Sequence, residues 1–214
     1  MVINMKKLLL IGGGGHCRSV ADSVLSSHIY DSVGIVDFAE TSAFEIPIVG
    51  TDDDLPGLFA NGWTDAFVTV GSVGNTAVRR RLYSLIKNIG FSIPIIIDPT
   101  AVIAKDVRIS EGSYIGKRAV VNTGSFLGSC SIINSGAIVE HDCKIGAFSH
   151  ISPGTILCGQ VTVSEDSHIG AGTTVRQMIT IGKHVLVGIG SVVVKDIPDY
   201  VTAYGNPCRM VAER

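Results

Sequence analysis

The clearest pattern along the chain is a repeat of six residues that runs from Ile103 to Val193. Every sixth position is aliphatic, the position two residues before it is mostly small, and glycine is frequent directly after it. The aliphatic positions are Ile103, Ile109, Ile115, Val121, Leu127, Ile133, Val139, Ile145, Ile151, Leu157, Val163, Ile169, Val175, Ile181, Val187 and Val193. Helices and ordinary strands have side-chain periods of 3.6 and 2, so neither maintains a period of six. The repeat predicts a parallel β-helix, in which short repeats stack and bury one continuous core.

A different pattern precedes the repeat, because short apolar runs alternate there with segments of helical spacing. The expected strands are residues 7–11, 33–36, 65–70 and 92–97, with a short piece at 47–50, and the expected helices are residues 19–25, 52–59 and 77–88. This alternation predicts a small, Rossmann-like parallel sheet with helices on its faces. Asp98-Pro99-Thr100 forms the junction, so we expect domains over residues 1–98 and 99–214.

Composition narrows the classes of function. Hydrophobic residues make up 46% of the chain, aromatic residues are few, and the formal net charge is −2 without a basic block. Nothing therefore indicates a nucleic acid or an acidic membrane surface as a partner. No apolar run approaches the ~18 residues of a membrane helix, and the apolar stretch near the N-terminus is too short for a signal peptide. The five cysteines form no CxxC pair, which favours reduced thiols and a cytoplasmic location.

The first candidate site is the glycine turn Gly12–Gly15 followed by His16. A glycine turn between a strand and a helix N-terminus lets backbone N–H groups approach a phosphate. The dinucleotide fingerprint GxGxxG would require glycine where Cys17 stands, so binding of NAD is disfavoured. Asp37, at the end of the second strand, is placed to bind a sugar hydroxyl. The alternative is that these glycines only form a tight turn.

The second candidate lies in the middle of the repeat, where His141 stands between Glu140 and Asp142, seven residues after Asn134. A carboxylate that binds one ring nitrogen of a histidine makes the other nitrogen a better base. We therefore interpret His141 as a general base, with a solvated polar corner as the alternative. A nucleophilic Cys143 is a further possibility.

The third candidate is the pair His150 and His168, which are eighteen residues apart. If three hexads make one coil, the two side chains stack at the strand spacing of ~4.8 Å. They would then line a cofactor groove, bind a metal or form a surface ladder. A zinc hydratase site built from His141, His150, His168 and His184 is an alternative, although no two of them have a close ligand spacing.

The whole chain resembles the bacterial sugar acyltransferases of the NeuD and PglD type, which include sialic acid O-acetyltransferases and nucleotide-4-amino-sugar N-acetyltransferases. The motifs that carry the resemblance are LLIGGGGH at residues 9–16, VEHDCKIG at 139–146, FSHISPG at 148–154 and GNP at 205–207. The resemblance implies a left-handed β-helix with three hexads per coil. It also implies a homotrimer with active sites between subunits, and acetyl-CoA as co-substrate without a metal.

The resemblance also implies roles for individual residues. His141 is similar to the family's general base, and Asp142 to the acid that orients it. The positions similar to those that bind acetyl-CoA are His150, Gly159, Ala171 and Ile189. The positions similar to those that bind the nucleotide sugar are Gly14, Gly15, His16, Asp37, Gly71, Ser72, Asn75 and Asn134.

Together these observations predict an acetyl-CoA-dependent N-acetyltransferase that acts on a nucleotide-linked amino sugar. Three alternatives remain open at this point. They are O-acetylation of a sugar of the sialic acid type, a zinc hydratase similar to γ-type carbonic anhydrases, and a nucleotide-sugar-binding protein without catalytic activity.

Overall fold

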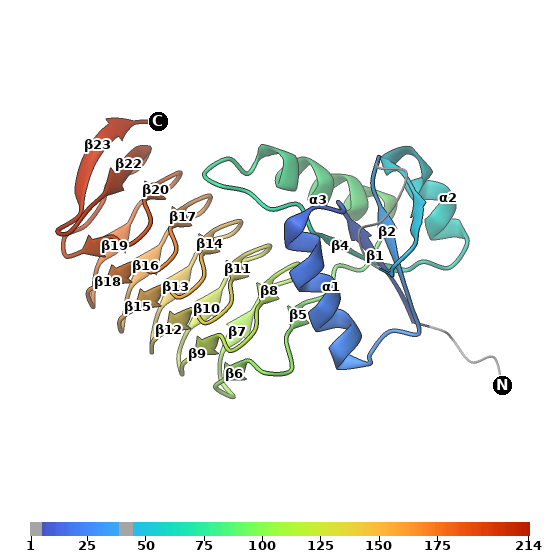
Figure 1. Cartoon of the computed structure of the whole chain (residues 1–214), viewed down its shortest axis with the longest axis horizontal. Helices are drawn as coiled ribbons and strands as arrows, with labels where there is room; N and C mark the ends of the chain where they lie inside the picture. The colour runs from blue at the N-terminus through green and yellow to red at the C-terminus, as the bar shows by residue number, and fades with distance from the viewer. Residues whose placement is uncertain (1–5, 39–44) are drawn as a thin grey trace. The chain divides into compact units, whose positions relative to one another are not determined.

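The computed structural model describes residues 6–38 and 45–214, which divide into two compact units (Figure 1). The first unit comprises Met1–Gly71 and Ala77–Ile96, and the second comprises Ser72–Thr76 and Ile97–Arg214. The short segment Ser72–Thr76 therefore groups with the repeat rather than with the sequence on either side of it.

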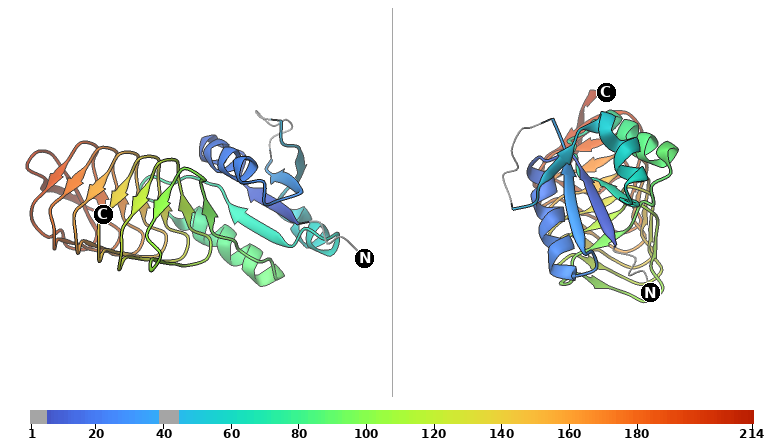
Figure 2. Two further views of the ribbon diagram at one scale, coloured as in Figure 1. Left: turned by 90° about the horizontal axis from the view of Figure 1, so that it is seen from below. Right: turned by 90° about the vertical axis from the view of Figure 1, so that its right-hand side faces the viewer.

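The first unit is built on a parallel four-stranded sheet in the order β3-β2-β1-β4. Its strands are β1 (Lys7–Ile11), β2 (Ser32–Val36), β3 (Ile48–Gly50) and β4 (Asp65–Val68), and its helices are α1 (Gly15–Ser27), η1 (Asp52–Asp54), α2 (Leu55–Ala60) and α3 (Ala77–Ile89). Alternate residues of a strand face opposite sides of its sheet. Accordingly, Leu9 and Ile11 pack with Leu55 of α2 and with Leu82 and Ile86 of α3, and α1 lies on the other side of the sheet (Figure 2). The predicted Rossmann-like sheet is confirmed.

The second unit is a left-handed parallel β-helix of very short strands, seen side by side in Figure 1. The strands are β5 (Ile96–Ile97), β6 (Val102–Ile103), β7 (Arg108–Ile109), β8 (Tyr114–Ile115), β9 (Val120–Val121), β10 (Phe126–Leu127), β11 (Ile132–Ile133), β12 (Ile138–Val139), β13 (Lys144–Ile145), β14 (His150–Ile151), β15 (Ile156–Leu157), β16 (Thr162–Val163), β17 (His168–Ile169), β18 (Thr174–Val175), β19 (Thr180–Ile181), β20 (Leu186–Val187), β21 (Val192–Val193), β22 (Val201–Tyr204) and β23 (Arg209–Glu213).

Each coil of the β-helix contains eighteen residues, because His150 pairs with His168 and Ile151 with Ile169. The strands form three sheets: the 5-stranded sheet runs from β7 to β19, the 8-stranded sheet contains β8, β11, β14, β17 and β20, and the 6-stranded sheet runs from β6 to β21. From β8 to β21 the second residue of each two-residue strand is the aliphatic residue of the repeat, and it is buried in the apolar core. The period of six therefore predicts both the positions of the strands and the way in which they stack.

The corners between the sheets place one residue per hexad in the left-handed backbone region. Non-glycine residues at such corners include Arg118 (φ 54°), Asp142 (φ 61°) and Gln160 (φ 61°). Glycine occupies other corners, among them Gly124 and Gly136. The stacked backbone hydrogen bonds of neighbouring coils hold these corners, so the fold accepts a side chain in a conformation that usually favours glycine.

Three details differ from the sequence-based expectation. Helix α1 begins at Gly15 rather than at Ser19, because the glycines continue directly into the first helical turn. The expected strand 92–97 is absent from the four-stranded sheet: Ser92 forms only an isolated bridge with Asp65, and β5 joins the 8-stranded sheet of the β-helix. The C-terminal tail forms the antiparallel pair β22–β23, for which the sequence analysis expects no strands.

Candidate active site

His141 and Asp142 lie at the corner between β12 of the 6-stranded sheet and β13 of the 5-stranded sheet. Nδ1 of His141 lies 2.9 Å from Oδ2 of Asp142, and the two side chains are 52% and 56% exposed. The backbone of this corner is held from both sides, because the Asp142 N–H donates to the Thr123 carbonyl and the Gln160 N–H donates to the His141 carbonyl, each at 2.9 Å. The pair is therefore fixed in the coil and open to solvent.

Gly159 stands eighteen residues after His141, at the same corner one coil further along. A Cβ at this position would lie 2.6 Å from Cε1 of the imidazole and closer still to Nε2. The ring of His141 therefore lies directly over the bare backbone of Gly159. Any side chain at position 159 would occupy the space of the ring.

The contact with Asp142 decides which nitrogen of His141 can act as a base. A carboxylate accepts, so the proton of the neutral ring stays on Nδ1 and the lone pair is on Nε2. The neighbouring Glu140 has a different partner, because its carboxylate accepts from the Asn122 amide at 3.0 Å. Of the two flanking acids, Asp142 orients the ring.

His150 forms a second polar cluster on the outer face of the 8-stranded sheet. Its Nε2 lies 3.0 Å from the Asn134 amide nitrogen, and its Nδ1 lies 3.4 Å from the carbonyl oxygen of Ser72. The Asn134 NH₂ can only donate, so Nε2 accepts and Nδ1 carries the proton. The structure thus brings together three predicted site residues, His150, Asn134 and Ser72.

His168 lies beside His150 on the next coil, as the eighteen-residue interval predicted, but the rings meet edge to face, with centroids 4.8 Å apart at 89°. Its Nε2 lies 3.2 Å from the Ser152 hydroxyl, and burial lowers its pKa. The nearby segment Ser72–Thr76, which contains Asn75, is anchored to the same unit, because the Thr76 hydroxyl donates to the buried carboxylate of Asp166.

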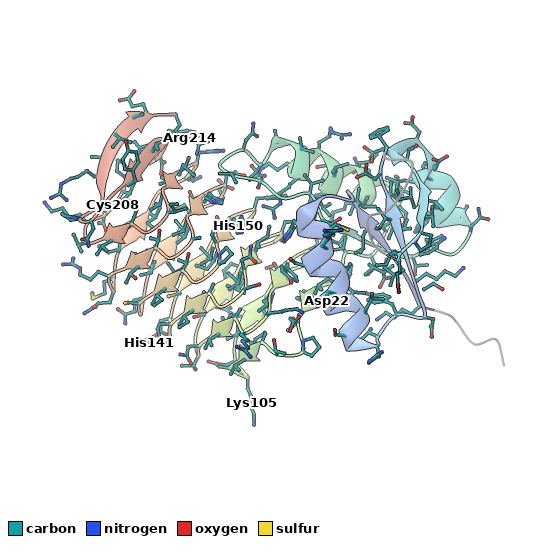
Figure 3. All side chains as sticks on the ribbon, in the orientation of Figure 1. Asp22, Lys105, His141, His150, Cys208 and Arg214 are labelled. Atoms are coloured by element: carbon teal, nitrogen blue, oxygen red, sulfur yellow. The ribbon has the colours of Figure 1, made fainter. Side chains whose placement is uncertain are left out.

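His141 and His150 do not meet within one chain (Figure 3). The corner that carries His141 joins the 5- and 6-stranded sheets, so in a three-sided coil it lies opposite the 8-stranded sheet that carries His150. The predicted acetyl-CoA residues are divided in a similar way. Ala171 and Ile189 stack at the corner that follows β17 and β20, where the Gly190 N–H donates to the Ala171 carbonyl. Gly159 lies across the 6-stranded sheet from them.

In the first unit, the predicted glycine turn leads into the N-terminus of α1. Gly14 is the N-cap residue, without a side-chain cap, and a Cβ at Gly14 or Gly15 would have no atom within 4 Å. The Gly13 N–H donates to the Asp37 carboxylate at 2.5 Å. The helix N-terminus therefore presents N–H groups beside open space, which suits an anion.

His16 lies on the first turn of α1 and packs against Gly71, because a Cβ at Gly71 would lie 3.3 Å from the Cβ of His16. Burial, and to a smaller extent the positive charge of Arg79, lower the pKa of His16 to about 4. Its imidazole is therefore neutral at pH 7. Gly14, Gly15, His16, Asp37 and Gly71 belong to this unit, whereas the other predicted substrate-binding residues, Ser72, Asn75 and Asn134, belong to the second unit.

Known proteins share the fold of this chain. The family model described as the PglD N-terminal domain matches residues 7–86. The acetyltransferase domain of PglB from Neisseria gonorrhoeae shares 37% identity with a TM-score of 0.91, over 96% of this chain and 100% of that chain. The chain belongs to the PglD-type family of sugar acetyltransferases.

Two further structures are similar to the chain. A perosamine N-acetyltransferase from Caulobacter crescentus is 36% identical with a TM-score of 0.90, over 97% of each chain. WeeI from Acinetobacter baumannii, at 24% identity and a TM-score of 0.81, shares the fold over 96% of this chain and 100% of that chain. A search of curated proteins gave no match.

The surroundings of Cys143 disfavour its role as a nucleophile. The Cys143 side chain is fully buried, its Sγ lies 3.3 Å from the Cys158 carbonyl, and burial raises its pKa to about 11. A buried, protonated thiol is a poor nucleophile. Within residues 6–38 and 45–214, no group of three His, Cys, Asp or Glu residues could hold a metal ion. In the same ranges no helix is both long and apolar enough to span a bilayer.

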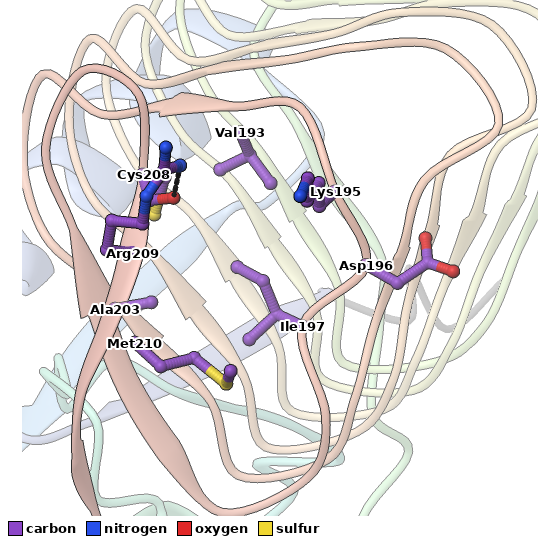
Figure 4. A pocket seen from close by; sticks show the side chains of 8 residues that line it. All are labelled: Val193, Lys195, Asp196, Ile197, Ala203, Cys208, Arg209 and Met210. Carbon is purple, nitrogen blue, oxygen red and sulfur yellow. Dashed lines mark hydrogen bonds between the residues drawn. The ribbon is translucent and has the colours of Figure 1, made fainter.

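A separate pocket of about 270 Å³ lies at the C-terminal end of the β-helix (Figure 4). Its lining residues are Val193, Lys195, Asp196, Ile197, Ala203, Cys208, Arg209 and Met210. The pocket contains none of the predicted site residues. It lies where the last coil is followed by the β22–β23 hairpin.

Two residues beside the His141–Asp142 pair, Gly124 and Asp106, are not among the predicted site residues. Gly124 lies one coil before Asp142, and a Cβ there would lie 3.3 Å from Cγ of Asp142. Asp106, one further coil back, accepts from the Gly124 N–H at 2.9 Å. The signal that could have found them is the interval of eighteen residues, which stacks positions 106, 124 and 142 at one corner.

Proposed function

We propose that this protein transfers the acetyl group of acetyl-CoA to the amino group of a nucleotide-linked amino sugar, with His141 as general base. The observation that carries the proposal is the His141–Asp142 pair, which lies at an open corner above the bare backbone of Gly159. The relatives support both substrates. The PglB domain has a structure in complex with acetyl coenzyme A, and the perosamine N-acetyltransferase has one in complex with CoA and GDP-perosamine.

The proposed reaction begins with a neutral His141 whose proton is on Nδ1. The amine nitrogen attacks the thioester carbonyl carbon while Nε2 accepts the proton that the nitrogen loses. The C–S bond then breaks, an amide is formed, and the sulfur of CoA leaves as a thiol after it takes up the proton from Nε2 of His141. Asp142 stabilises the imidazolium that forms in between, and the Gly159 N–H is our candidate for binding the carbonyl oxygen as it becomes negative.

The other site residues are proposed to bind the two substrates. Gly14 and Gly15 at the start of α1 would bind a phosphate of the nucleotide, with Asp37 holding a hydroxyl group. Asn134 would orient the acceptor, and His150, Ala171 and Ile189 would contact acetyl-CoA.

We further propose that the active enzyme is a homotrimer with its sites between subunits. His141 and His150 face different sides of one β-helix, so a single chain does not bring them to one substrate. The 6-stranded sheet lies between them and has an apolar outer face. The outward residues on this face are Val102, Val120, Ile138, Ile156, Thr174 and Val192. A mostly apolar stripe of exposed and partly exposed residues is typical of a surface that is buried in an assembly.

A cytoplasmic location is part of the same proposal. The five cysteines are free, and acetyl-CoA is a co-substrate of the cell interior.

The trimer itself is tested by light scattering during gel filtration, which we expect to give three times the chain mass of 22.5 kDa. Ile138→Lys combined with Ile156→Lys should lower that mass, whereas Lys144→Glu on the 5-stranded sheet should leave it unchanged. A wild-type protein that elutes as a monomer would contradict the assembly.

The function is tested by release of the CoA thiol from acetyl-CoA in the presence of UDP-, GDP- and dTDP-linked 4-amino sugars. Each amino sugar is paired with a control that carries a hydroxyl group at the same carbon. We expect turnover with at least one amino sugar, a product heavier by one acetyl group, and no turnover with its hydroxyl partner. Acetylation of the hydroxyl partners instead would indicate an O-acetyltransferase. Binding without turnover across the panel would indicate a protein that only recognises nucleotide sugars.

A further inference from the structure

Gly124 lies at the same corner of the β-helix as Asp142, one coil earlier. Its backbone is left-handed, with φ of 71°. This conformation alone does not explain a glycine, because Arg118, Cys130 and Gln160 adopt it at other corners of the same β-helix. Something other than backbone geometry must therefore favour the absence of a side chain at position 124.

The Asp142 carboxylate fills the space that a side chain at position 124 would need. A Cβ there would lie 3.3 Å from Cγ of Asp142 and much closer to Oδ1. The other oxygen, Oδ2, is the one that contacts Nδ1 of His141 at 2.9 Å. A shift of the carboxylate away from a new methyl group would change its contact with the imidazole.

The backbone of Gly124 is itself held in place, so it cannot retreat. The carboxylate of Asp106 accepts from the Gly124 N–H at 2.9 Å and from the Thr123 hydroxyl at 2.9 and 3.0 Å. These bonds lower the pKa of Asp106, the hydroxyl of Thr123 having the larger effect. On the other side, the Thr123 carbonyl accepts from the N–H of Asp142. Asp106 thus fixes the corner on which the Asp142 side chain rests.

We infer that Gly124 is a positioning residue for catalysis: its missing side chain leaves the space in which the Asp142 carboxylate turns toward His141. Its effect on activity rests on the proposed role of His141, whereas its effect on the carboxylate follows from the geometry alone. Gly159 bounds the same pair on the following coil, so the dyad lies between two bare backbones.

Gly136 provides a matched control for this inference. It is also a left-handed corner, with φ of 65°, but a Cβ built there has no neighbouring atom within 4 Å. Gly136→Ala introduces the same backbone strain as Gly124→Ala without a contact to the dyad. Any difference between the two variants therefore reports the contact with Asp142 rather than the loss of glycine.

The experiment measures activity and the tautomer of His141 in the full-length chain. We expect Gly124→Ala to lower kcat about tenfold at nearly constant KM for acetyl-CoA, an effect of the size found for neighbouring residues that share one interaction. Imidazole ¹⁵N chemical shifts, with His141 assigned by its loss in His141→Asn, should show less proton on Nδ1. Gly136→Ala should match wild type in both measurements. Equal behaviour of the two variants would overturn the inference.

A double-mutant cycle separates positioning from general damage. In an Asp142→Ala background the carboxylate is gone, so Gly124→Ala should reduce kcat no further. A full additional loss in that background would overturn the inference. If His141→Asn kept wild-type activity while Gly124→Ala still changed the tautomer, the general-base proposal would fail and the positioning of Asp142 would stand. If Gly124→Ala kept the normal tautomer of His141 while His141→Asn was inactive, the positioning inference would fail and the general-base proposal would stand.

Discussion

The β-helix carries two histidine clusters that differ in how many of their ring nitrogens are occupied. At the corner, Nδ1 of His141 contacts Asp142, and the ring lies half exposed over Gly159. On the 8-stranded sheet, His150 has Asn134 at Nε2 and the Ser72 carbonyl at Nδ1. A base needs a nitrogen whose lone pair is available. The first cluster is therefore suited to take up a proton, and the second to hold a fixed position.

Among changes to the residues that hold the two rings, the largest effect should follow from removing the charge that orients His141. Asp142→Asn places an amide beside Nδ1, favours the wrong tautomer, and should lower kcat/KM by roughly 10²-fold or more. The matched control is Glu140→Gln, since Glu140 binds Asn122 and should tolerate the change within a few-fold. Steady-state kinetics with an amino sugar that the panel shows to be a substrate provide the measurement. Equal losses in both variants would remove the distinction between the two acids.

A smaller effect should follow from changing the second cluster. Asn134→Ala removes the donor to Nε2 of His150, which should loosen the ring and raise KM about three- to tenfold with little change in kcat. The measurement is a pair of saturation curves, one for each substrate. A loss of kcat as large as that of Asp142→Asn would show that the second cluster takes part in the chemistry.

The smallest effect concerns acid stability. Burial lowers the pKa of His168 from its ordinary value of 6.5, so the unfolded chain binds more protons than the folded chain once the pH falls below that value. Stability should therefore decrease from pH 7 to pH 5, and His168→Asn should reduce the decrease by about 1–3 °C in Tm. His16, whose pKa is lowered to about 4, acts in the same direction, so part of the decrease should remain. If Tm fell equally from pH 7 to pH 5 in His168→Asn and in the wild type, His168 would make no contribution to the acid sensitivity.

The sequence predicted the regular part of the molecule best. In the β-helix the aliphatic residue of each hexad closes a strand, because stacked coils leave room for one inward side chain at that position. The predicted start of α1 was wrong, because the glycines continue directly into the first helical turn. The predicted strand at residues 92–97 was wrong, because an apolar segment does not reveal which sheet it joins. The β22–β23 hairpin was missed, since Arg209–Glu213 is exposed throughout and has no apolar pattern.

The candidate site was predicted less completely, because its contacts join different coils. His141 and Asp142 are neighbours in the sequence, so their pairing followed from the motif. The pairing of Asn134 with His150 depends on side-chain geometry across one coil, and the roles of Gly124 and Asp106 depend on the corner that they share with Asp142. Local motifs thus predict the reacting groups, whereas the structure is needed to find the residues that hold them.

The central claim is that His141, and not His150, removes the proton from the acceptor amine. It is tested most directly by comparing kcat of His141→Ala and His150→Ala in acetyl transfer, with both substrates saturating. We predict that His141→Ala loses roughly 10²- to 10⁴-fold in kcat, whereas His150→Ala keeps kcat within about tenfold and loses mainly in KM. A His141→Ala protein with kcat near that of wild type would contradict the account.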